Sequence, residues 1–220
     1  MKKAFTLAET LVTLGIIGVV AALTMPTLIQ KHQKHTTVTK LKQTYSLLFQ
    51  ALKSSEIDNG EISNWDFGEV GCTGASVFTE KYIAPYLKVV KKCICDNTGE
   101  CDITGTSLND STSTADADYY TTRSEKLFLS NGSIISVSRA PATDFPIFIV
   151  DINGKQKPNV IGKDIFEFEY YNGKFAPRGA MHDKNDLKTE TNGCYKEGSG
   201  AFCAQMIMLD NWQISEDYPW

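Results

Sequence analysis

The sequence predicts an α+β protein in which a long hydrophobic N-terminal helix packs on an antiparallel β-sheet head domain with disulfide-clipped loops. Three observations support this class. An apolar run near the start continues into an amphipathic helical pattern, two Asn-Gly pairs separate β-prone runs further on, and all six cysteines follow the helical region. Helical and strand patterns that come in separate blocks, without alternating, are typical of α+β folds.

Composition limits the size of the core and the classes of partner. A chain of 220 residues with 42% hydrophobic content can bury one core of ordinary size, so we expect one globular domain with an appendage. The formal charge of -4 is spread along the chain without long basic runs. Attraction to a nucleic-acid backbone needs clustered positive charge. The composition therefore argues against nucleic-acid binding.

Residues 5–29 form an apolar segment in which Glu9 is the only ionisable residue. A helix needs about 20 such residues to cross the hydrocarbon core of a bilayer. A secretory signal peptide is the alternative, with Val-Ala-Ala at 20–22 as a tolerable cleavage site. Glu9 favours a retained membrane segment, because a carboxylate inside an apolar span is costly unless it finds a partner.

Residues 3–9, Lys-Ala-Phe-Thr-Leu-Ala-Glu, resemble the prepilin processing motif of type IV pilins and type II secretion pseudopilins. That motif is a short basic leader, a small residue and then Phe-Thr-Leu-x-Glu. The resemblance implies that prepilin peptidase removes the leader 1–4 by cutting after Ala4 and methylates the new N-terminus at Phe5. It also implies that Glu9 acts in assembly, by meeting the N-terminus of a neighbouring subunit.

Two further positions bear on the resemblance. Pro26 stands where members of the family commonly carry a helix-kinking proline. Ala4 departs from the pattern, since the family usually has glycine there, but alanine is also small.

The resemblance implies a structural subunit of a bacterial type II secretion or type IV pilus-like filament. Such a subunit is a single-pass protein of the inner membrane, with its head in the periplasm or in an extracellular filament. Its partners would be other pilin or pseudopilin subunits, prepilin peptidase and the inner-membrane assembly platform. The alternative function is a signal-anchored periplasmic binding module that acts as a monomer.

No enzymatic activity and no cofactor are expected. The sequence contains no nucleophile elbow, no phosphate-binding glycine loop and no His-Glu-x-x-His helix. His32 and His35, three residues apart, could be offered as metal ligands, but they are expected to be interfacial polar residues beside Lys31 and Lys34.

Past Pro26 the pattern predicts an amphipathic continuation of the helix over residues 30–56, ended by Asp58-Asn59-Gly60. The apolar residues on one side of this helix could instead form a coiled-coil seam, but this apolar stripe spans fewer than three heptads. The head domain is expected to occupy residues 57–220. The apolar stripe consists of Val38, Leu41, Tyr45, Leu48 and Leu52.

The second half of the chain predicts strands. A short helix is expected first over residues 78–90, interrupted by Pro85, and then a surface loop over 96–118, which is rich in Thr, Ser, Asp, Asn and Gly. Asn-Gly between β-prone runs is the strongest short hairpin signal. The expected strands are 126–130 and 133–138 around Asn131-Gly132, 147–150, and 166–171 and 174–177 around Asn172-Gly173.

Residues 151–166, which begin Asp-Ile-Asn-Gly, resemble the segment before the final strands of pseudopilin-type proteins. Some major pseudopilins bind calcium in a late loop. Side-chain oxygens of Asp151, Asn153 and Asp164, with backbone carbonyls, could supply a hard cation with oxygen ligands. However, Asx-Gly turns need no metal, and two lysines stand where further acids would help. The sequence leaves calcium open, and no metal site is predicted.

The cysteines indicate an oxidising compartment. Cys194 and Cys203 flank a short glycine-containing segment and are predicted to form a disulfide. Cys72 is expected to bridge one of the other three cysteines, which leaves the remaining two to each other. A four-thiolate zinc site is the alternative, but the usual C-x2-C pairs are absent. The other three cysteines are Cys93, Cys95 and Cys101.

Overall fold

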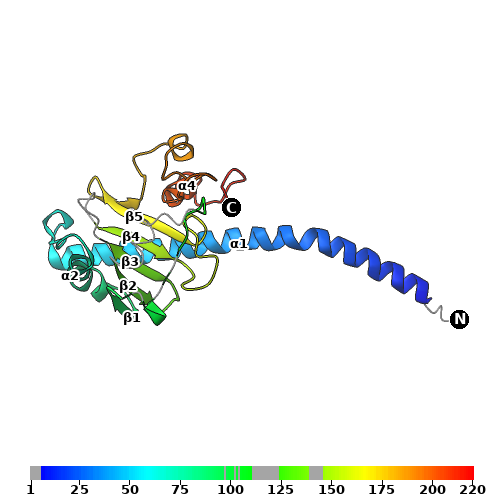
Figure 1. Cartoon of the computed structure of the whole chain (residues 1–220), viewed down its shortest axis with the longest axis horizontal. Coiled ribbons are helices and arrows are strands. Elements are labelled where there is room, and N and C mark those ends of the chain that lie inside the picture. Colours follow the sequence, from blue (N-terminus) through cyan, green and yellow to red (C-terminus); the bar gives the residue numbers. More distant parts are fainter. Residues whose placement is uncertain (1–5, 97, 102, 104, 111–123, 139–145) are drawn as a thin grey trace. The chain divides into compact units, whose positions relative to one another are not determined.

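The computed structural model describes residues 6–96, 98–101, 103, 105–110, 124–138 and 146–220. It is an α+β structure, as the sequence predicts (Figure 1). The chain divides into two compact units, Met1–Thr36 and Thr37–Trp220, and each is described by itself.

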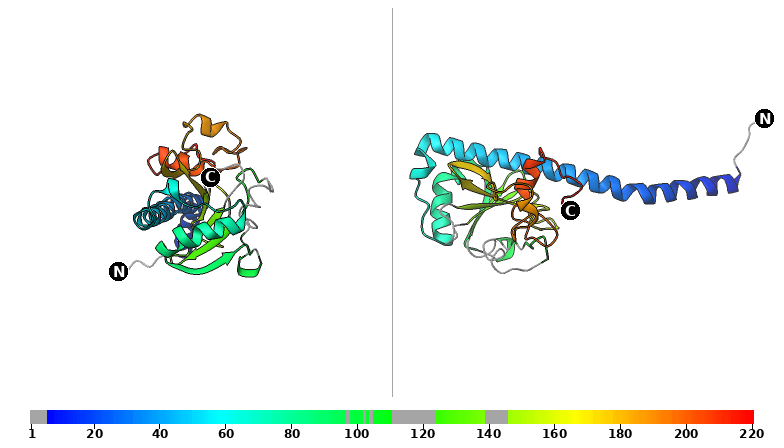
Figure 2. Two further views of the ribbon diagram at one scale, coloured as in Figure 1. Left: turned by 90° about the vertical axis from the view of Figure 1, so that its left-hand side faces the viewer. Right: turned by 90° about the horizontal axis from the view of Figure 1, so that it is seen from above.

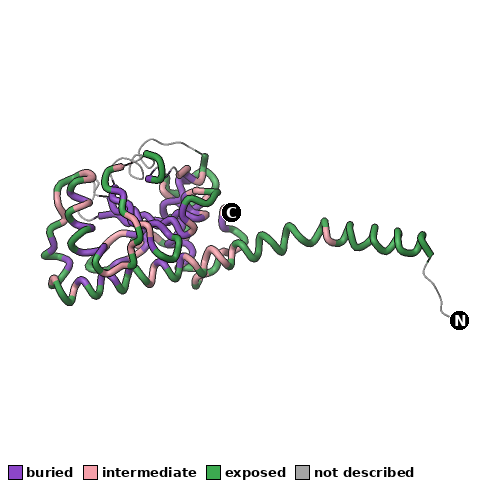
Figure 3. The backbone as a smooth tube through the Cα atoms, turned by 90° about the horizontal axis from the view of Figure 1, so that it is seen from below, coloured by how far each residue is buried: buried purple, intermediate pink, exposed green. Residues whose placement is uncertain are grey.

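Helix α1 (Leu7–Asn59) contributes to both units and runs without interruption past Pro26. In the second unit, Leu41, Leu48 and Leu52 of this helix are buried, which confirms the predicted amphipathic stripe (Figure 3). The helix ends where the sequence predicts. Gly60 follows with a φ of 79°, and its N–H donates to the carbonyl of Glu56 at 2.9 Å. Glycine takes this left-handed conformation without a Cβ clash, which is why it commonly follows a helix.

The head contains one six-stranded antiparallel sheet in which every strand pairs with its neighbour in sequence. Both predicted Asn-Gly hairpins are confirmed. Asn172 and Gly173 have φ values of 48° and 74°, as a turn that matches the twist of a hairpin requires. The strands are β1 (Val89–Ile94), β2 (Ser124–Leu129), β3 (Ile134–Ser138), β4 (Ile147–Asp151), β5 (Ile165–Tyr171) and β6 (Lys174–Pro177).

The main core lies on one face of this sheet. Helix α2 (Cys72–Tyr82) and the second part of α1 both bury apolar side chains there (Figure 2). Tyr45 packs on Phe168 and Phe175, with ring centroids 5.4 Å apart in both pairs. Because side chains alternate along a strand, the residues between these core positions face the other side of the sheet. A second, smaller cluster of isoleucines lies there: Ile147, Ile149, Ile161 and Ile165.

Two predicted elements need correction. The helix expected over residues 78–90 ends at Tyr82, and Val90 belongs to β1. Pro85 lies in a 3-10 turn, η2 (Ala84–Tyr86), after which β-branched residues pair with β2. Helix α4 (Cys203–Leu209), which contacts β5, was not predicted.

The segment 96–118 is also wrong as a simple surface loop. In its described part, Ile103 and Ser107 are buried, and Thr106 forms a β-bridge with Val160. A short 3-10 helix, η3 (Gly99–Cys101), lies in the same segment. The polar composition of the segment did not indicate these contacts, because they are made with residues far away in sequence.

Three disulfides join parts of the head, so the zinc alternative is wrong. Cys72–Cys95 connects the start of α2 to the end of β1, with Cα atoms 5.6 Å apart. Cys93–Cys101 connects β1 to η3, at 5.7 Å. Cys194–Cys203 closes the loop before α4, at 4.7 Å, which is the pairing that the spacing predicted.

Candidate functional site

The apolar part of α1, residues 7–29, carries a single carboxylate, Glu9, in a defined structure. Thr6 donates from its N–H and from its hydroxyl to Glu9 Oε2, both at 2.8 Å. In return the Glu9 N–H donates to Thr6 Oγ1 at 3.3 Å. This reciprocal pair is a capping box, which satisfies backbone donors that the first turn of a helix leaves free. The Thr-x-x-Glu spacing is the sequence signature of this box, so Glu9 has a structural role in addition to the role in assembly that the resemblance implies.

The other predicted N-terminal positions are only partly within the described chain. The leader 1–4, including Ala4, and the predicted new N-terminus Phe5 lie outside the described residues. Pro26 lies inside α1. Its ring nitrogen cannot donate to the carbonyl of Ala22, four residues earlier, which weakens the helix ladder at that point. The kink itself stays a prediction.

Among the residues that the structure describes, α1 is the one helix long and apolar enough to cross a bilayer. Its most apolar stretch has a mean hydropathy of 2.1, and none of that stretch is buried within the chain. A signal sequence near the N-terminus has the same properties. The exposed large apolar side chains occupy every side of the helix, a pattern typical of surroundings that are apolar all round. They are Leu7, Leu11, Val12, Leu14, Ile16, Ile17, Val19, Val20, Leu23, Met25, Leu28 and Ile29.

In the head, the loop between β4 and β5 gathers the polar residues that the sequence singled out. Asp164 accepts hydrogen bonds from the N–H groups of Asn159 at 2.8 Å and Val160 at 2.7 Å. It also accepts from Asn153 Nδ2 at 3.2 Å. Asp151 Oδ1 accepts the Asn153 N–H at 3.1 Å. The structure therefore brings Asp151, Asn153 and Asp164 together and adds Asn159, a residue that the sequence analysis did not weigh as a ligand.

Three side-chain oxygens of this polar loop are buried without a hydrogen-bond partner in the described part of the chain: Asp151 Oδ2, Asn153 Oδ1 and Asn159 Oδ1. A buried acceptor left unpaired is destabilising. Burial raises the pKa of Asp151 to about 8, and the charge of Asp164 acts in the same direction. Burial also raises the pKa of Asp164, against the hydrogen bonds that it accepts.

The oxygens of this loop are of the type that binds a hard cation, and they could equally be satisfied by ordered water. The described residues contain no group of three or more His, Cys, Asp or Glu arranged to hold a metal. A cation here would therefore depend on two carboxylates, two amide oxygens and backbone carbonyls. With no cation bound, the raised pKa keeps Asp151 largely neutral at pH 7.

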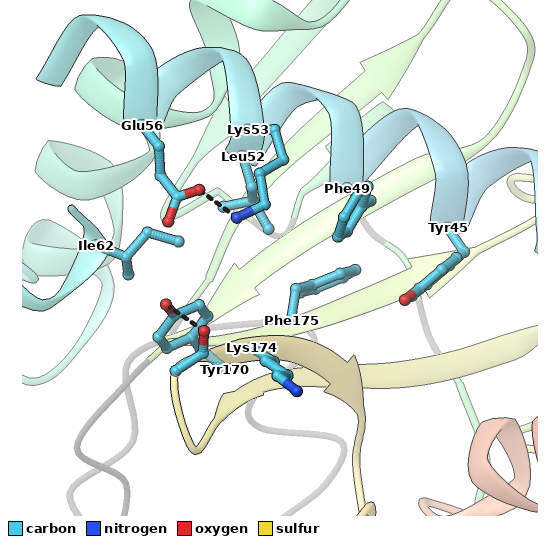
Figure 4. A pocket seen from close by; sticks show the side chains of 10 residues that line it. Tyr45, Phe49, Leu52, Lys53, Glu56, Ile62, Tyr170, Lys174 and Phe175 are labelled. Carbon is cyan, nitrogen blue, oxygen red and sulfur yellow. Dashed lines mark hydrogen bonds and ion pairs between the residues drawn. The ribbon is translucent and has the colours of Figure 1, made fainter. Parts of the chain in front are cut away.

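A groove of about 390 Å³ lies between α1 and the β5–β6 hairpin (Figure 4). Its lining combines aromatic, aliphatic and charged side chains, and two of the charged groups, Lys53 and Glu56, bind one another. Lys53 Nζ contacts Glu56 Oε2 at 2.5 Å, and the Tyr170 hydroxyl donates to the carbonyl of Gly173 at 2.8 Å. Among the described residues that line the groove, no nucleophile has an adjacent base. The lining residues are Tyr45, Phe49, Leu52, Lys53, Glu56, Ile62, Tyr170, Gly173, Lys174 and Phe175.

A family model described as a family of unknown function, DUF6613, matches residues 27–220. The chain belongs to the DUF6613 family. No curated protein and no solved structure matches the chain. The DUF6613 match begins directly after Pro26, so it contains the three disulfides and the polar loop. Glu9 and all of the exposed apolar residues of α1 up to Met25 precede the matched segment, whereas Leu28 and Ile29 lie at its start.

Proposed function

We propose that this DUF6613 chain is a structural subunit of a bacterial filament, of the type II secretion or type IV pilus kind. The observation that carries the proposal is a lone carboxylate, Glu9, in residues 7–29 of α1, where exposed apolar side chains occupy every side of the helix. It stands in a Phe-Thr-Leu-x-Glu motif that resembles the prepilin processing site.

The apolar helix requires surroundings that the chain itself does not supply. Exposing so many Leu, Ile and Val side chains to water is unfavourable. A bilayer satisfies this surface while the subunit is a single-pass membrane protein. In a filament, the same surface packs against the helices of neighbouring subunits.

The carboxylate then needs a partner inside that apolar environment. The capping box gives Glu9 two donors from Thr6, but both are neutral groups, so the negative charge is not compensated. Cleavage after Ala4 creates an ammonium group at Phe5. Pairing Glu9 with the ammonium of a neighbouring subunit neutralises two charges that are each costly in hydrocarbon.

This proposal defines the partners and the location. They are other pilin or pseudopilin subunits, prepilin peptidase and the assembly platform of the inner membrane. The head lies on the oxidising side, in the periplasm or along an extracellular filament, where its three disulfides form. We propose no catalytic role and no cofactor.

The test is to replace Glu9 by Gln in the full chain, in cells that carry the assembly system. We expect removal of the leader and normal folding of the head, but incorporation into sheared filaments at least about tenfold lower, since an unpaired ammonium in an apolar core costs several kcal/mol. Thr10→Val is the matched control, because the Thr10 hydroxyl bonds only to carbonyls of its own helix.

The alternative, a signal-anchored binding module that acts as a monomer, makes a different prediction. Its mature chain would stay in the membrane fraction without forming filaments, and Glu9→Gln would change nothing. N-terminal sequencing provides a second test. A mature chain that begins elsewhere than Phe5 would contradict the proposal.

A further inference from the structure

Glu125 is a fully buried carboxyl group on β2, below helix α2. Its relative exposure is 0%. It shares the core face of the strand with Leu127 and Leu129, and it lies between Ile94 of β1 and Val137 of β3. The next residue, Lys126, faces the other side, where its Nζ donates to the carbonyls of Asp96 and Cys101. Lys126 therefore does not neutralise Glu125.

Both carboxyl oxygens of Glu125 are buried without a hydrogen bond of normal geometry among the described residues, and the polar side chains that act on them from α2 are Ser76 and Glu80. A carboxylate in such a site lacks both water and a counter-charge, so the neutral form is favoured. This arrangement is unlike that of Glu167, another buried glutamate, which is held by Arg178 at 2.5 Å.

Two charged groups act on Glu125 in opposite directions: Glu80 opposes its ionisation, and Lys92 favours it. From α2, Glu80 adds a second negative charge, while the Ser76 hydroxyl favours ionisation weakly. From β1, Lys92 is already committed to Glu80, with its Nζ at 2.6 and 2.7 Å from the two Glu80 oxygens. The residue opposite on β3 is Val137, which is apolar. Burial first, and then the charge of Glu80, raise the pKa of Glu125 to about 7.

Helix α2 is attached at one end by a covalent bond and elsewhere by packing. Cys72, its first residue, is bonded to Cys95 at the end of β1. Ala75, Phe78 and Tyr82 pack into the core further along the helix. A local separation of α2 from β1 and β2 would hydrate Glu125 without releasing the start of the helix.

We propose that Glu125 makes the contact between α2 and the sheet pH-dependent: the contact is closed while the carboxyl is protonated and loosens when the proton is lost. The proton goes to solvent, and the disulfide Cys72–Cys95 keeps α2 attached throughout. This device depends only on the fold of the head, and it is independent of the proposed filament function.

The sign of the effect follows from the raised pKa. The unfolded or opened chain has an ordinary glutamate pKa of 4.5. The closed state therefore binds more protons than the open state, so its stability is fully present below about pH 4.5 and is lost as the pH rises through about 7.

Hydrogen exchange of the full chain in detergent, followed by mass spectrometry of peptides from α2 and corrected for intrinsic rates, tests this proposal. The equilibrium for opening α2 should increase by about tenfold between about pH 6 and pH 8.5, as linkage gives for a pKa that falls from about 7 to 4.5 on opening. Glu125→Gln should abolish this increase. Glu100→Gln, at an exposed glutamate that pairs with Lys91, should leave it unchanged.

A second variant keeps the proposal testable if Glu125→Gln does not fold. Glu80→Gln, at a partly exposed position, removes the second negative charge and frees Lys92, so the pH dependence should become weaker. The proposal is overturned if exchange of α2 in the parent does not depend on pH, or if a folded Glu125→Gln or Glu80→Gln variant keeps the full dependence.

Discussion

The two units of this chain are ordered in different ways. In the first unit, the hydrogen bonds of Thr6, Glu9 and Thr13 stay within one turn of the helix, and the large apolar side chains are exposed. In the second unit, apolar side chains from α1, α2, the sheet and α4 form one core, and disulfides join segments distant in sequence. The first unit thus has local order but no core of its own. The second unit, in contrast, buries its apolar side chains within the chain.

The largest effect is expected from a cavity in the head, because the second unit depends on its own core for stability. Phe78 is 1% exposed and contacts Trp65, Tyr82 and Phe148. Phe78→Ala should lower the free energy of unfolding of the head by about 3–5 kcal/mol, through lost burial and the cavity. Denaturant titration of the full chain in detergent measures this. Val77→Ala, at a half-exposed neighbour, should cost less than about 1 kcal/mol.

Removing the disulfide Cys194–Cys203 should have the next largest effect. The bond closes a loop with a sequence separation of 9, so replacing both cysteines by alanine should cost about 2 to 3 kcal/mol in the chain-entropy model. Glu197→Gln, at an exposed position in the same loop, is the control. Equal stability of the double variant and the parent would mean that the surrounding packing alone holds the loop.

The polar loop predicts a dependence of stability on pH. Because the pKa of Asp151 is raised to about 8 in the folded state, its contribution is fully present below about pH 4 and is lost as the pH rises through 8. Asp151→Asn should therefore remove roughly 2 kcal/mol of the loss of stability between about pH 6 and pH 8 in the presence of a chelator.

Adding calcium tests whether a bound cation or ordered water satisfies the buried oxygens of this loop. A bound cation holds Asp151 in its ionised form, so millimolar calcium chloride would cancel the pH dependence in the parent and raise its melting temperature. Ordered water in the loop would leave both unchanged.

The smallest effect is expected in the first unit. Thr6→Val removes the hydroxyl of the capping box and should weaken the first turn of α1 by about 1 kcal/mol. Faster amide exchange over residues 7–10, with unchanged unfolding of the head, is the expected result. Thr13→Val, whose hydroxyl donates to the carbonyl of Thr10 at 2.9 Å, is the control. A parallel loss of stability in the head would contradict the independence of the two units.

Local signals explain which elements could be predicted. Asn131-Gly132 and Asn172-Gly173 located both hairpins, because their preferred backbone conformation is set within the turn. Gly60 located the end of α1 for the same reason. Strand β1 was missed, since it is short, contains two adjacent lysines and becomes a strand only by pairing with β2, more than 30 residues away in sequence.

The same distinction between local signals and long-range packing applies to the candidate sites. Asp151, Asn153 and Asp164 were selected from sequence by residue type, but their unpaired oxygens, and the part of Asn159, follow from how the loop is buried. Nothing in the sequence around Glu125 indicated that its carboxyl group is buried. A glutamate within a β-prone run is ordinarily expected to face solvent, and only the packing of α2 makes it a buried carboxyl.

By itself, the sequence determined the long helix, its apolar and amphipathic halves, the two hairpins and the pairing of Cys194 with Cys203. These depend on periodicity, turn preference and short separation, which are properties of neighbouring residues. The tertiary structure alone decided the pairing of Cys72 with Cys95 and of Cys93 with Cys101, the position of β1 and the burial of Glu125 and Asp151. Each of these depends on which distant segments pack together, because burial and the loss of hydration are set by the whole core rather than by adjacent residues.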